Sequence, residues 1–300
     1  PVPMAAISRL ASVGALRARS GDLSLYCWHR QKNMPAVLPL TEDLGEFFGK
    51  WVADGCYSRG GVRLANHVRE ADHYESLCRR LFGHVTRFVK LAGGNGVDLV
   101  INSTLLQRLM EQGLEMAHDS HHKRVPPVIF LAPRPVVAAF LRGYFSGDGT
   151  FTGKLIEAST VSRGLANDVM TLLQYFGIAA RCRTKKEWSG STSYRVRFVW
   201  SEFLGRFVDE IGFADETRNA AIREYLANLG LRRKLQTPES HITNDVLWDL
   251  VVEKRREPYA REHVYDLSVP GTERFVAGFG NVLVHNSEEN LRRVFRQARQ

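Results

Sequence analysis

The sequence predicts an α+β fold in which an αββαββα unit occurs twice and forms a pseudo-two-fold monomer, followed by a β-rich C-terminal segment. Two observations carry this prediction. An amphipathic run that ends in Asp-Gly occurs at residues 44–55 and again at residues 140–149. After each run, helical and alternating hydrophobic patterns follow in the same order.

The composition is that of a globular protein with a polyanionic partner. The 300 residues are 44% hydrophobic and 24% charged, which suits one large domain or two modest ones. Lys and Arg number 41 against 32 Asp and Glu, which gives a net charge of +9. We find no apolar run long enough to span a membrane and no signal-peptide pattern. The four cysteines form no C-x-x-C pair, which argues against a zinc ribbon and favours a reducing, cytoplasmic location.

Each Asp-Gly run presents two small residues on one helical face. Gly49 and Ala53 are spaced i,i+4 in the first run, and Gly143 and Gly147 have the same spacing in the second. Two such faces can pack with their backbones in close contact. We therefore expect the two helices to pair.

Asp54 and Asp148 fall in the last turns of these helices if Gly55 and Gly149 are left-handed terminating residues. The helix dipole disfavours a carboxylate there by about 0.3–1 kcal/mol, and two paired helices add mutual repulsion. A shared divalent cation would reverse both penalties, and oxygen ligands suit Mg²⁺. The alternative is that Asp-Gly is simply common at turns.

The remaining elements repeat in order. The first unit is expected to contain a strand, a helix, a hairpin and a helix, at residues 61–66, 69–82, 84–102 and 105–116. The second is expected to contain a strand, a helix, two strands and a helix, at residues 153–159, 164–176, 179–188, 193–200 and 202–229.

Two strands of the second unit carry cations on one face. Alternation places three cations of the strand at residues 179–187 on a common face, and two of the next strand likewise. Such a ribbon fits the DNA major groove, although a solvated sheet face is the alternative. The first unit is less basic. The candidate DNA-binding residues are Arg181, Arg183, Lys185, Arg195 and Arg197, with Arg63, Arg87 and Lys90 in the first unit.

Residues 47–55 and 141–149 resemble the helix motif of the LAGLIDADG homing endonucleases, and the resemblance covers roughly residues 41–230. It implies that the paired helices join two saddle-shaped halves and that Asp54 and Asp148 bind the catalytic Mg²⁺ ions. The stretch Lys123-Arg-Val-Pro126 looks like the family's Lys-x-Ile-Pro, which makes Lys123 an active-site lysine unless it is a surface lysine. Lys234 is a weak candidate for the second unit.

The resemblance implies two-metal hydrolysis of double-stranded DNA. Ions held by the two aspartates would polarise the scissile phosphates and lower the pKa of bound water. Lys123 would stabilise charge on the phosphate or help to activate water. Val52 and Ser146 stand where the motif's name has an acidic residue, which we interpret as tolerated variation.

Residues 264–287 resemble the C-terminal end of an intein. The resemblance implies that the Asn286 amide attacks its own carbonyl carbon and releases the peptide that begins at Ser287. His285 would polarise that carbonyl, Ser287 would be the nucleophile that receives the upstream segment, and Asp266 would assist the N-terminal steps. Glu273-Arg-Phe275 departs from the usual His-Asn-Phe. The alternative is an ordinary Asn-Ser turn after a hairpin.

The sequence as given lacks the N-terminal splicing residues. Position 1 is Pro, and no Thr-x-x-His is found. We expect the upstream part to lie outside this sequence or on another polypeptide, truncation being the simpler account. C-terminal cleavage at Asn286 remains chemically feasible. Residues 287–300 resemble the helix after the phosphate-binding loop of p97-type AAA ATPases, so we expect them to belong to the host protein.

These predictions give one organisation. The expected segments are a partial N-terminal splicing region or linker (1–40), endonuclease repeat 1 (41–126), endonuclease repeat 2 (127–236), a C-terminal splicing segment (237–286) and the start of the C-extein (287–300). We expect a monomeric, Mg²⁺-dependent, site-specific DNA endonuclease fused to a splicing element. Its partners would be the intein-less host gene, as double-stranded DNA, and the host extein segments, with no membrane. The alternative is a nuclease-inactive DNA-binding or purely splicing remnant in an AAA ATPase host.

Overall fold

The structure is a computed structural model that describes residues 24–27, 30–35, 38–89, 95–188, 190–232, 242–243, 246–248, 250–251, 253–255, 267 and 269–285. The chain divides into two compact units, Pro1–Leu235 and Gln236–Gln300. The first unit contains both predicted repeats. The predicted duplicated α+β fold is confirmed in this unit, because the same order of helices and strands occurs twice.

The first half follows a short hairpin of β1 (Ser24–Cys27) and β2 (Arg30–Pro35). Helix α2 begins where the Thr41 side chain accepts a hydrogen bond from the Leu44 backbone N–H at 3.3 Å. The elements of this half are α2 (Glu42–Asp54), β3 (Gly55–Ser58), β4 (Gly61–His67), α3 (Val68–Phe82), β5 (Thr86–Val89), β6 (Gly96–Ile101), α4 (Thr104–Arg108) and the π-helical turn η1 (Leu109–Gly113).

The second half repeats this order after a short helix, α5 (Pro127–Phe130). Helix α6 starts with a proline in its first turn, where no backbone N–H is needed. The elements of this half are α6 (Arg134–Asp148), β7 (Gly149–Phe151), β8 (Ile156–Thr160), α7 (Arg163–Gln174), β9 (Arg181–Lys186), β10 (Thr192–Phe198), α8 (Ser201–Glu210) and α9 (Glu216–Arg232).

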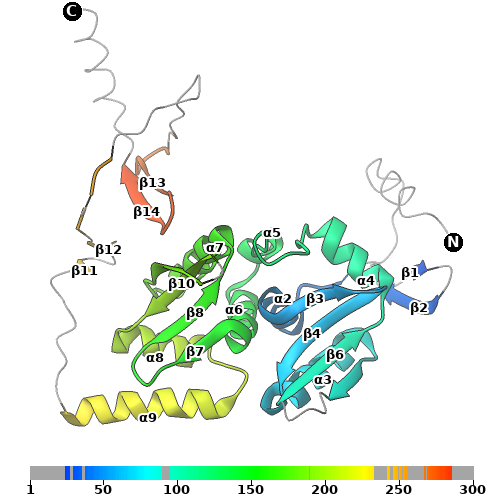
Figure 1. The fold of residues 1–300 in the computed structure, drawn as a ribbon. Coiled ribbons are helices and arrows are strands. Elements are labelled where there is room, and N and C mark those ends of the chain that lie inside the picture. The colour runs from blue at the N-terminus through cyan, green and yellow to red at the C-terminus, as the bar shows by residue number, and fades with distance from the viewer. Residues whose placement is uncertain are drawn as a thin grey trace, which may run out of the picture. The chain divides into compact units, whose positions relative to one another are not determined.

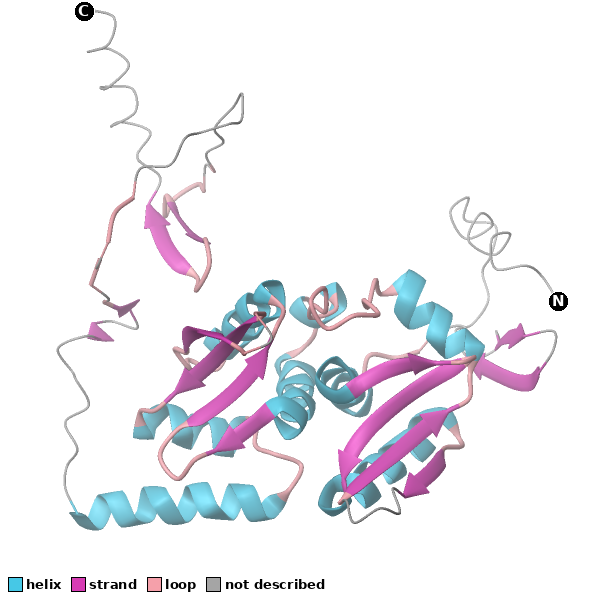
Figure 2. Cartoon of the chain, in the orientation of Figure 1, coloured by secondary structure: helices cyan, strands magenta, loops and turns pink. Residues whose placement is uncertain are grey.

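Each half contains a four-stranded antiparallel sheet with the same arrangement. The strand order is β3-β4-β6-β5 in the first half and β7-β8-β10-β9 in the second. Helix α3 packs against the first sheet and α7 against the second, so that helices cover one face of each sheet (Figure 2). Alternate residues fill these cores, for example Leu64 and Leu99 in the first half and Val196 in the second, all fully buried.

Helices α2 and α6 lie side by side between the two sheets (Figure 1). Their backbones approach so closely that a Cβ atom added to Gly49 would lie 1.9 Å from the Phe140 carbonyl oxygen. A Cβ atom on Gly143 would likewise lie 2.1 Å from the Glu46 carbonyl oxygen. The expectation that small residues let the two helices pair is therefore confirmed.

Two details of the helices differ from the sequence predictions. Gly55 and Gly149 are extended rather than left-handed, with φ near −90° and −88°, because β3 and β7 begin at these residues. The need for glycine is steric: a Cβ atom on Gly55 would lie 2.5 Å from the Trp51 carbonyl oxygen. The helix predicted over residues 202–229 is two helices, because Gly212 adopts a left-handed φ of 66° between them.

The predicted helix over residues 105–116 is also interrupted, since α4 passes into the π-helical turn η1 and Glu115 has a positive φ of 53°. In the second unit the described residues form the short pair β11 (Ile242–Thr243) and β12 (Val246–Leu247), and a hairpin of β13 (Arg274–Ala277) and β14 (Val282–His285). Within the described part of the chain, no helix is long and apolar enough to cross a bilayer.

Candidate functional site

The paired helices bring Asp54 and Asp148 to the same end of the α2–α6 contact. Each aspartate is the last residue of its helix. The two final turns touch, because a Cβ atom added to Gly147 would lie 2.5 Å from the Ala53 Cβ and 2.7 Å from Asp54 Oδ2. Both aspartates remain partly exposed to solvent. Two carboxylates from different halves thus share one solvent-accessible site.

Asp148 is held in an environment that disfavours its charge. Burial raises the pKa of this carboxyl to about 7, and the charge of Asp54 contributes to the rise. The ammonium groups of Lys123 and Lys50 oppose it but do not cancel it. A cation placed between the two carboxylates would stabilise the ionised form of Asp148 and so lower its pKa.

Asp54 differs from Asp148 because it already has a cationic partner. Lys50 Nζ lies 2.7 Å from Asp54 Oδ2, and the Lys50 side chain is almost fully buried. The same ammonium lies 3.7 Å from Glu70 Oε2 on α3. Among the described residues, no lysine or arginine forms such an ion pair with Asp148.

Lys123 lies at the end of α2 and is 7% exposed. Its ammonium donates to the carbonyl oxygens of Trp51, Val52 and Gly55 at 3.2, 3.0 and 2.8 Å. Burial lowers the pKa of Lys123, whereas the charges of Asp148 and Asp54 raise it. The lysine therefore caps α2 with a positive charge beside both carboxylates.

The second half holds the backbone around Lys123. The Ser162 hydroxyl donates to the Lys123 carbonyl oxygen at 2.8 Å. Next to it, Arg124 forms a bidentate pair with the buried Asp168 carboxylate, at 2.6 and 2.8 Å. Lys123 is thus anchored by one half while its ammonium contacts the other.

Arg218 on α9 is the counterpart of Lys123 in the second half, although it is not among the site residues predicted from the sequence. It donates to the carbonyl oxygens of Ser146 at 2.9 Å and Gly149 at 3.0 Å. These two residues occupy the motif positions of Val52 and Gly55, which Lys123 contacts. Arg218 also pairs with Glu70 and lies over the Phe213 ring.

The spacing along the chain could have identified Arg218. Lys123 lies 69 positions after Asp54 (123 − 54), and Arg218 lies 70 positions after Asp148 (218 − 148). Counting from each aspartate rather than toward the next motif gives this match. Lys234, the weak sequence candidate, lies outside the described residues.

The basic ribbon of the second half has the register that alternation predicts. Arg195 pairs with Arg183, Arg197 with Arg181, and Ser193 with Lys185, so the five cations share one face of the sheet. Part of this charge is compensated: Arg195 lies 3.3 Å from Glu157 and Lys185 lies 3.0 Å from Glu187. The opposite face, which contains Val196 and Phe198, packs into the core.

The two predicted cations of the first half that the structure describes, Arg63 and Arg87, lie on opposite faces of the sheet. Arg87 pairs across the sheet with the buried Leu99, so it lies on the face that α3 covers. There it contacts Asp72 at 2.5 Å and Glu75 at 3.1 Å. Arg63 lies on the other face, 3.5 Å from Asp98, and Lys90 lies outside the described residues. We therefore leave Arg87 out of the candidate DNA surface.

The hairpin β13–β14 ends at the predicted splice junction. Arg274 pairs with His285 and Phe275 with Val284 in the antiparallel register. Gly278, Gly280 and Asn281 have positive φ values that form the tight turn. The other candidate splicing residues, Asp266, Asn286 and Ser287, lie outside the described residues, as does the tail over residues 287–300.

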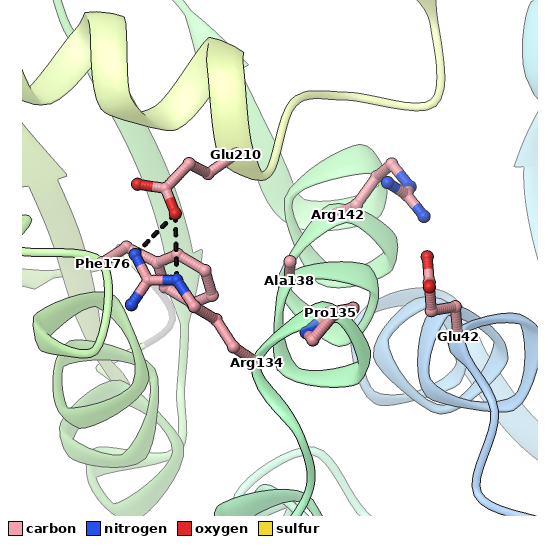
Figure 3. A pocket seen from close by; sticks show the side chains of 7 residues that line it. All are labelled: Glu42, Arg134, Pro135, Ala138, Arg142, Phe176 and Glu210. Carbon is pink, nitrogen blue, oxygen red and sulfur yellow. Dashed lines mark hydrogen bonds and ion pairs between the residues drawn. The ribbon is translucent and has the colours of Figure 1, made fainter.

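A cavity of about 250 Å³ lies at the other end of α6, away from the aspartates (Figure 3). In it Arg134, the first residue of α6, pairs with Glu210 at 2.5 Å and lies over the Phe176 ring. Asp148, at the other end of α6, is 14 residues away, which corresponds to about 21 Å along a helix. We assign no chemistry to this cavity.

The donor set fits a hydrated Mg²⁺ ion better than a metal held by protein ligands alone. Within the described residues, no cluster of three or more His, Cys, Asp or Glu side chains could hold a metal. Mg²⁺ keeps several waters and is usually bound by one or two carboxylates plus phosphate oxygens. Asp54 and Asp148 supply that number, and burial together with the charge of Asp54 raises the pKa of Asp148.

Comparisons with known proteins agree with this geometry. Residues 135–212 match the family model described as a LAGLIDADG-like domain. The chain is 30% identical over 288 residues to a DNA polymerase of Thermococcus hydrothermalis, a match that covers 85% of the chain and 16% of the polymerase. It is 28% identical over 239 residues to the replicative DNA helicase DnaB of Rhodothermus marinus, covering 57% of the chain and 25% of the helicase. The chain thus spans only a small part of these relatives.

Solved structures of similar fold include mesophilic variants of the homing endonuclease I-DmoI, with 17% identity, a TM-score of 0.45, and coverage of 58% of this chain and 97% of that one. Another is the LAGLIDADG meganuclease I-AabMI bound to uncleaved DNA, with 14% identity, a TM-score of 0.40, and coverage of 66% and 93%. The family-model match identifies residues 135–212, in the second half of the duplicated fold, as a LAGLIDADG-like domain.

Proposed function

We propose that the chain is a LAGLIDADG homing endonuclease carried by an intein, which cuts double-stranded DNA at a specific site with Mg²⁺. One observation carries the nuclease proposal. The close contact between α2 and α6 brings Asp54 and Asp148, one from each half, to a shared and partly exposed site. Two carboxylates, one from each half, could hold metal ions at the two scissile phosphates of one duplex, one on each strand.

Asp54 and Asp148 would hold the metal. Bound Mg²⁺ supplies Lewis-acid polarisation of the scissile phosphate and a water of lowered pKa. Two cationic residues of the chain would act beside the metal. Lys123 and Arg218 cap the two helix ends and place positive charge beside the carboxylates, where the phosphate would add negative charge in the transition state.

The sheets would position the duplex. Arg181, Arg183, Lys185, Arg195 and Arg197 share one face of the second sheet, with Arg63 on the corresponding face of the first. Cations on this face of the four-stranded sheet can contact phosphates and guanine edges in the major groove. The uneven charge of the two sheets predicts unequal contacts with the two half-sites.

The sequence relatives suit a segment that is inserted into host proteins of different function. The chain matches small parts of a DNA polymerase and of a replicative helicase, which are proteins of different function. A mobile element in different genes would give this pattern. We assign the splicing chemistry to Asn286 as the cyclising residue, His285 as its assisting group, Ser287 as the nucleophile and Asp266 as an auxiliary acid. An AAA ATPase host remains a prediction from residues 287–300.

Cleavage of the uninterrupted host gene tests the nuclease proposal. The full chain should linearise a plasmid that carries this gene in the presence of Mg²⁺, and EDTA should stop the reaction. A variant with both Asp54→Asn and Asp148→Asn is the matched control and should be inactive. If neither this plasmid nor a library of targets is cut, the chain is a DNA-binding or purely splicing remnant instead.

The splicing proposal has a separate test. A chain extended beyond Ser287 by a reporter should release the peptide that begins at Ser287, and Asn286→Ala should abolish the release. Release that continues in the Asn286→Ala variant would refute the assigned role of Asn286.

A further inference from the structure

Lys50 breaks the pseudo-symmetry of the two helix ends. It stands four residues before Asp54 on α2, and the residue at the same position of α6 is Tyr144. The Lys50 side chain is 2% exposed, and its Nζ lies 2.7 Å from Asp54 Oδ2. The hydroxyl of Tyr144 is buried and has no hydrogen-bond partner among the described residues. Among the described residues, a lysine is therefore in direct ion-pair contact with Asp54 but not with Asp148.

Glu70 offers Lys50 a second acceptor. Its carboxylate is buried, with Oε2 at 3.7 Å from Lys50 Nζ. Its other oxygen, Oε1, accepts a hydrogen bond from Arg218. The two oxygens thus have different partners, and Oε2 can take over the Lys50 ammonium without displacing Arg218. A small movement of one lysine side chain separates the two pairings.

We propose that Lys50 is an internal counter-ion that competes with the divalent metal for Asp54, so that the metal binds first through Asp148. This inference rests on the proposed nuclease function. A buried ammonium in contact with a carboxylate opposes the approach of a second cation strongly, because screening by water is weak there. Binding at Asp54 requires Lys50 to move to Glu70, whereas Asp148 needs no such exchange.

Because only the Asp54 site requires this movement of Lys50, the two halves differ in their affinity for the metal. The Asp148 site fills at a lower metal concentration than the Asp54 site. At limiting Mg²⁺ one DNA strand is therefore cut before the other, and nicked DNA accumulates. Lys50 acts through Asp54 and Glu70 and does not itself contact the substrate.

Binding of Mn²⁺ to the full chain without DNA tests this inference apart from catalysis. Electron paramagnetic resonance of free Mn²⁺ gives the affinity of each site when the other aspartate is removed. The Asp148→Asn protein, which retains Asp54, should bind Mn²⁺ at least about tenfold more weakly than the Asp54→Asn protein. Adding Lys50→Met should strengthen binding at least about tenfold in the Asp148→Asn protein and by less than about threefold in the Asp54→Asn protein.

Two further variants separate the electrostatic effect from damage to the fold. Lys50→Gln keeps a polar side chain and should strengthen binding at Asp54 as Lys50→Met does. Glu70→Gln removes the second acceptor of Lys50 and should weaken binding in the Asp148→Asn protein while leaving the Asp54→Asn protein nearly unchanged, whereas general unfolding would weaken both. Equal affinities of the two sites, or no gain from either Lys50 substitution while Mn²⁺ still binds, would overturn the inference. Absence of Mn²⁺ binding in every protein, the unsubstituted chain included, would overturn the metal site itself.

Discussion

The C-terminal turns of α2 and α6 share a backbone but not a charge distribution. Both turns end in an aspartate followed by an extended glycine, and both have their carbonyl oxygens bound by a cation, Lys123 in one case and Arg218 in the other. Lys50 pairs with Asp54, whereas Tyr144 stands at the corresponding place near Asp148. The duplication thus preserves helix packing and capping, and the electrostatics of the two halves are free to differ.

Removal of either carboxylate should have the largest effect. Asp54→Asn and Asp148→Asn should each lower double-strand cleavage at least about 1000-fold, because each removes a metal ligand and its charge. Single-turnover cleavage of a duplex labelled on both strands measures this effect and shows which strand remains reactive. If either variant cuts both strands within tenfold of the unsubstituted chain, the carboxylates do not form one site.

Much of this arrangement could be predicted from the sequence because it depends on local pattern. Asp-Gly at the end of each amphipathic run located both helices, and Gly49 and Gly143 predicted their close contact. Alternation on residues 179–200 predicted the common face of the five cations, since residues two apart point to the same side of a strand.

The remaining features depend on contacts between distant segments. Gly55 was predicted to be left-handed, yet the strand that follows requires an extended conformation. The face on which Arg87 lies is set by its pairing with Leu99, which no local pattern specifies. Arg218 lies in a long helical stretch, and its contact with the end of α6 exists only after the second half folds.

The two capping cations should have the next largest effect. Lys123→Met and Arg218→Met should each lower the single-turnover cleavage rate by about 100-fold, since each removes a positive group beside the reacting phosphate. DNA affinity should change much less, and a filter-binding assay with Ca²⁺ in place of Mg²⁺ measures it separately. Arg218→Lys is the matched control and should recover part of the rate, because it restores the charge without the planar guanidinium that contacts the two carbonyl oxygens.

A uniform loss of DNA affinity, with an unchanged cleavage rate at saturating DNA, would show that Lys123 and Arg218 serve binding alone.

Replacement of cations on the two sheets should have smaller effects, which differ between the halves. Arg183 and Arg197 have no carboxylate partner among the described residues, so their joint replacement by Ala should weaken DNA binding by about tenfold and reduce the salt dependence by about two units. Arg87→Ala should leave both quantities unchanged, because Arg87 contacts Asp72 and Glu75 under α3. Binding measured across a series of KCl concentrations distinguishes these outcomes, and a reduced salt dependence in Arg87→Ala would contradict the assigned face.

The smallest expected effect is on stability. The pKa of Asp148 is raised to about 7, so the folded chain holds this proton more tightly than the unfolded chain does. Without metal, the free energy of unfolding should therefore fall by about 1.4 kcal/mol from pH 6 to pH 8 through this group. Urea denaturation of the unsubstituted chain and of Asp148→Asn at both pH values isolates the contribution. Mg²⁺ should restore the lost stability at pH 8 in the unsubstituted chain only.

An equal pH dependence in the two proteins would show that Asp148 has an ordinary environment.

We propose above all that carboxylates from both halves hold the catalytic metal ions at the shared end of α2 and α6. Anomalous diffraction from Mn²⁺ in crystals of the chain with its target DNA tests it most directly. We expect ions with carboxylate oxygens of Asp54 and Asp148 at about 2.0–2.6 Å and phosphate oxygens of the DNA in the same coordination spheres. Ions bound elsewhere on the chain, with both aspartates free of metal, would contradict it.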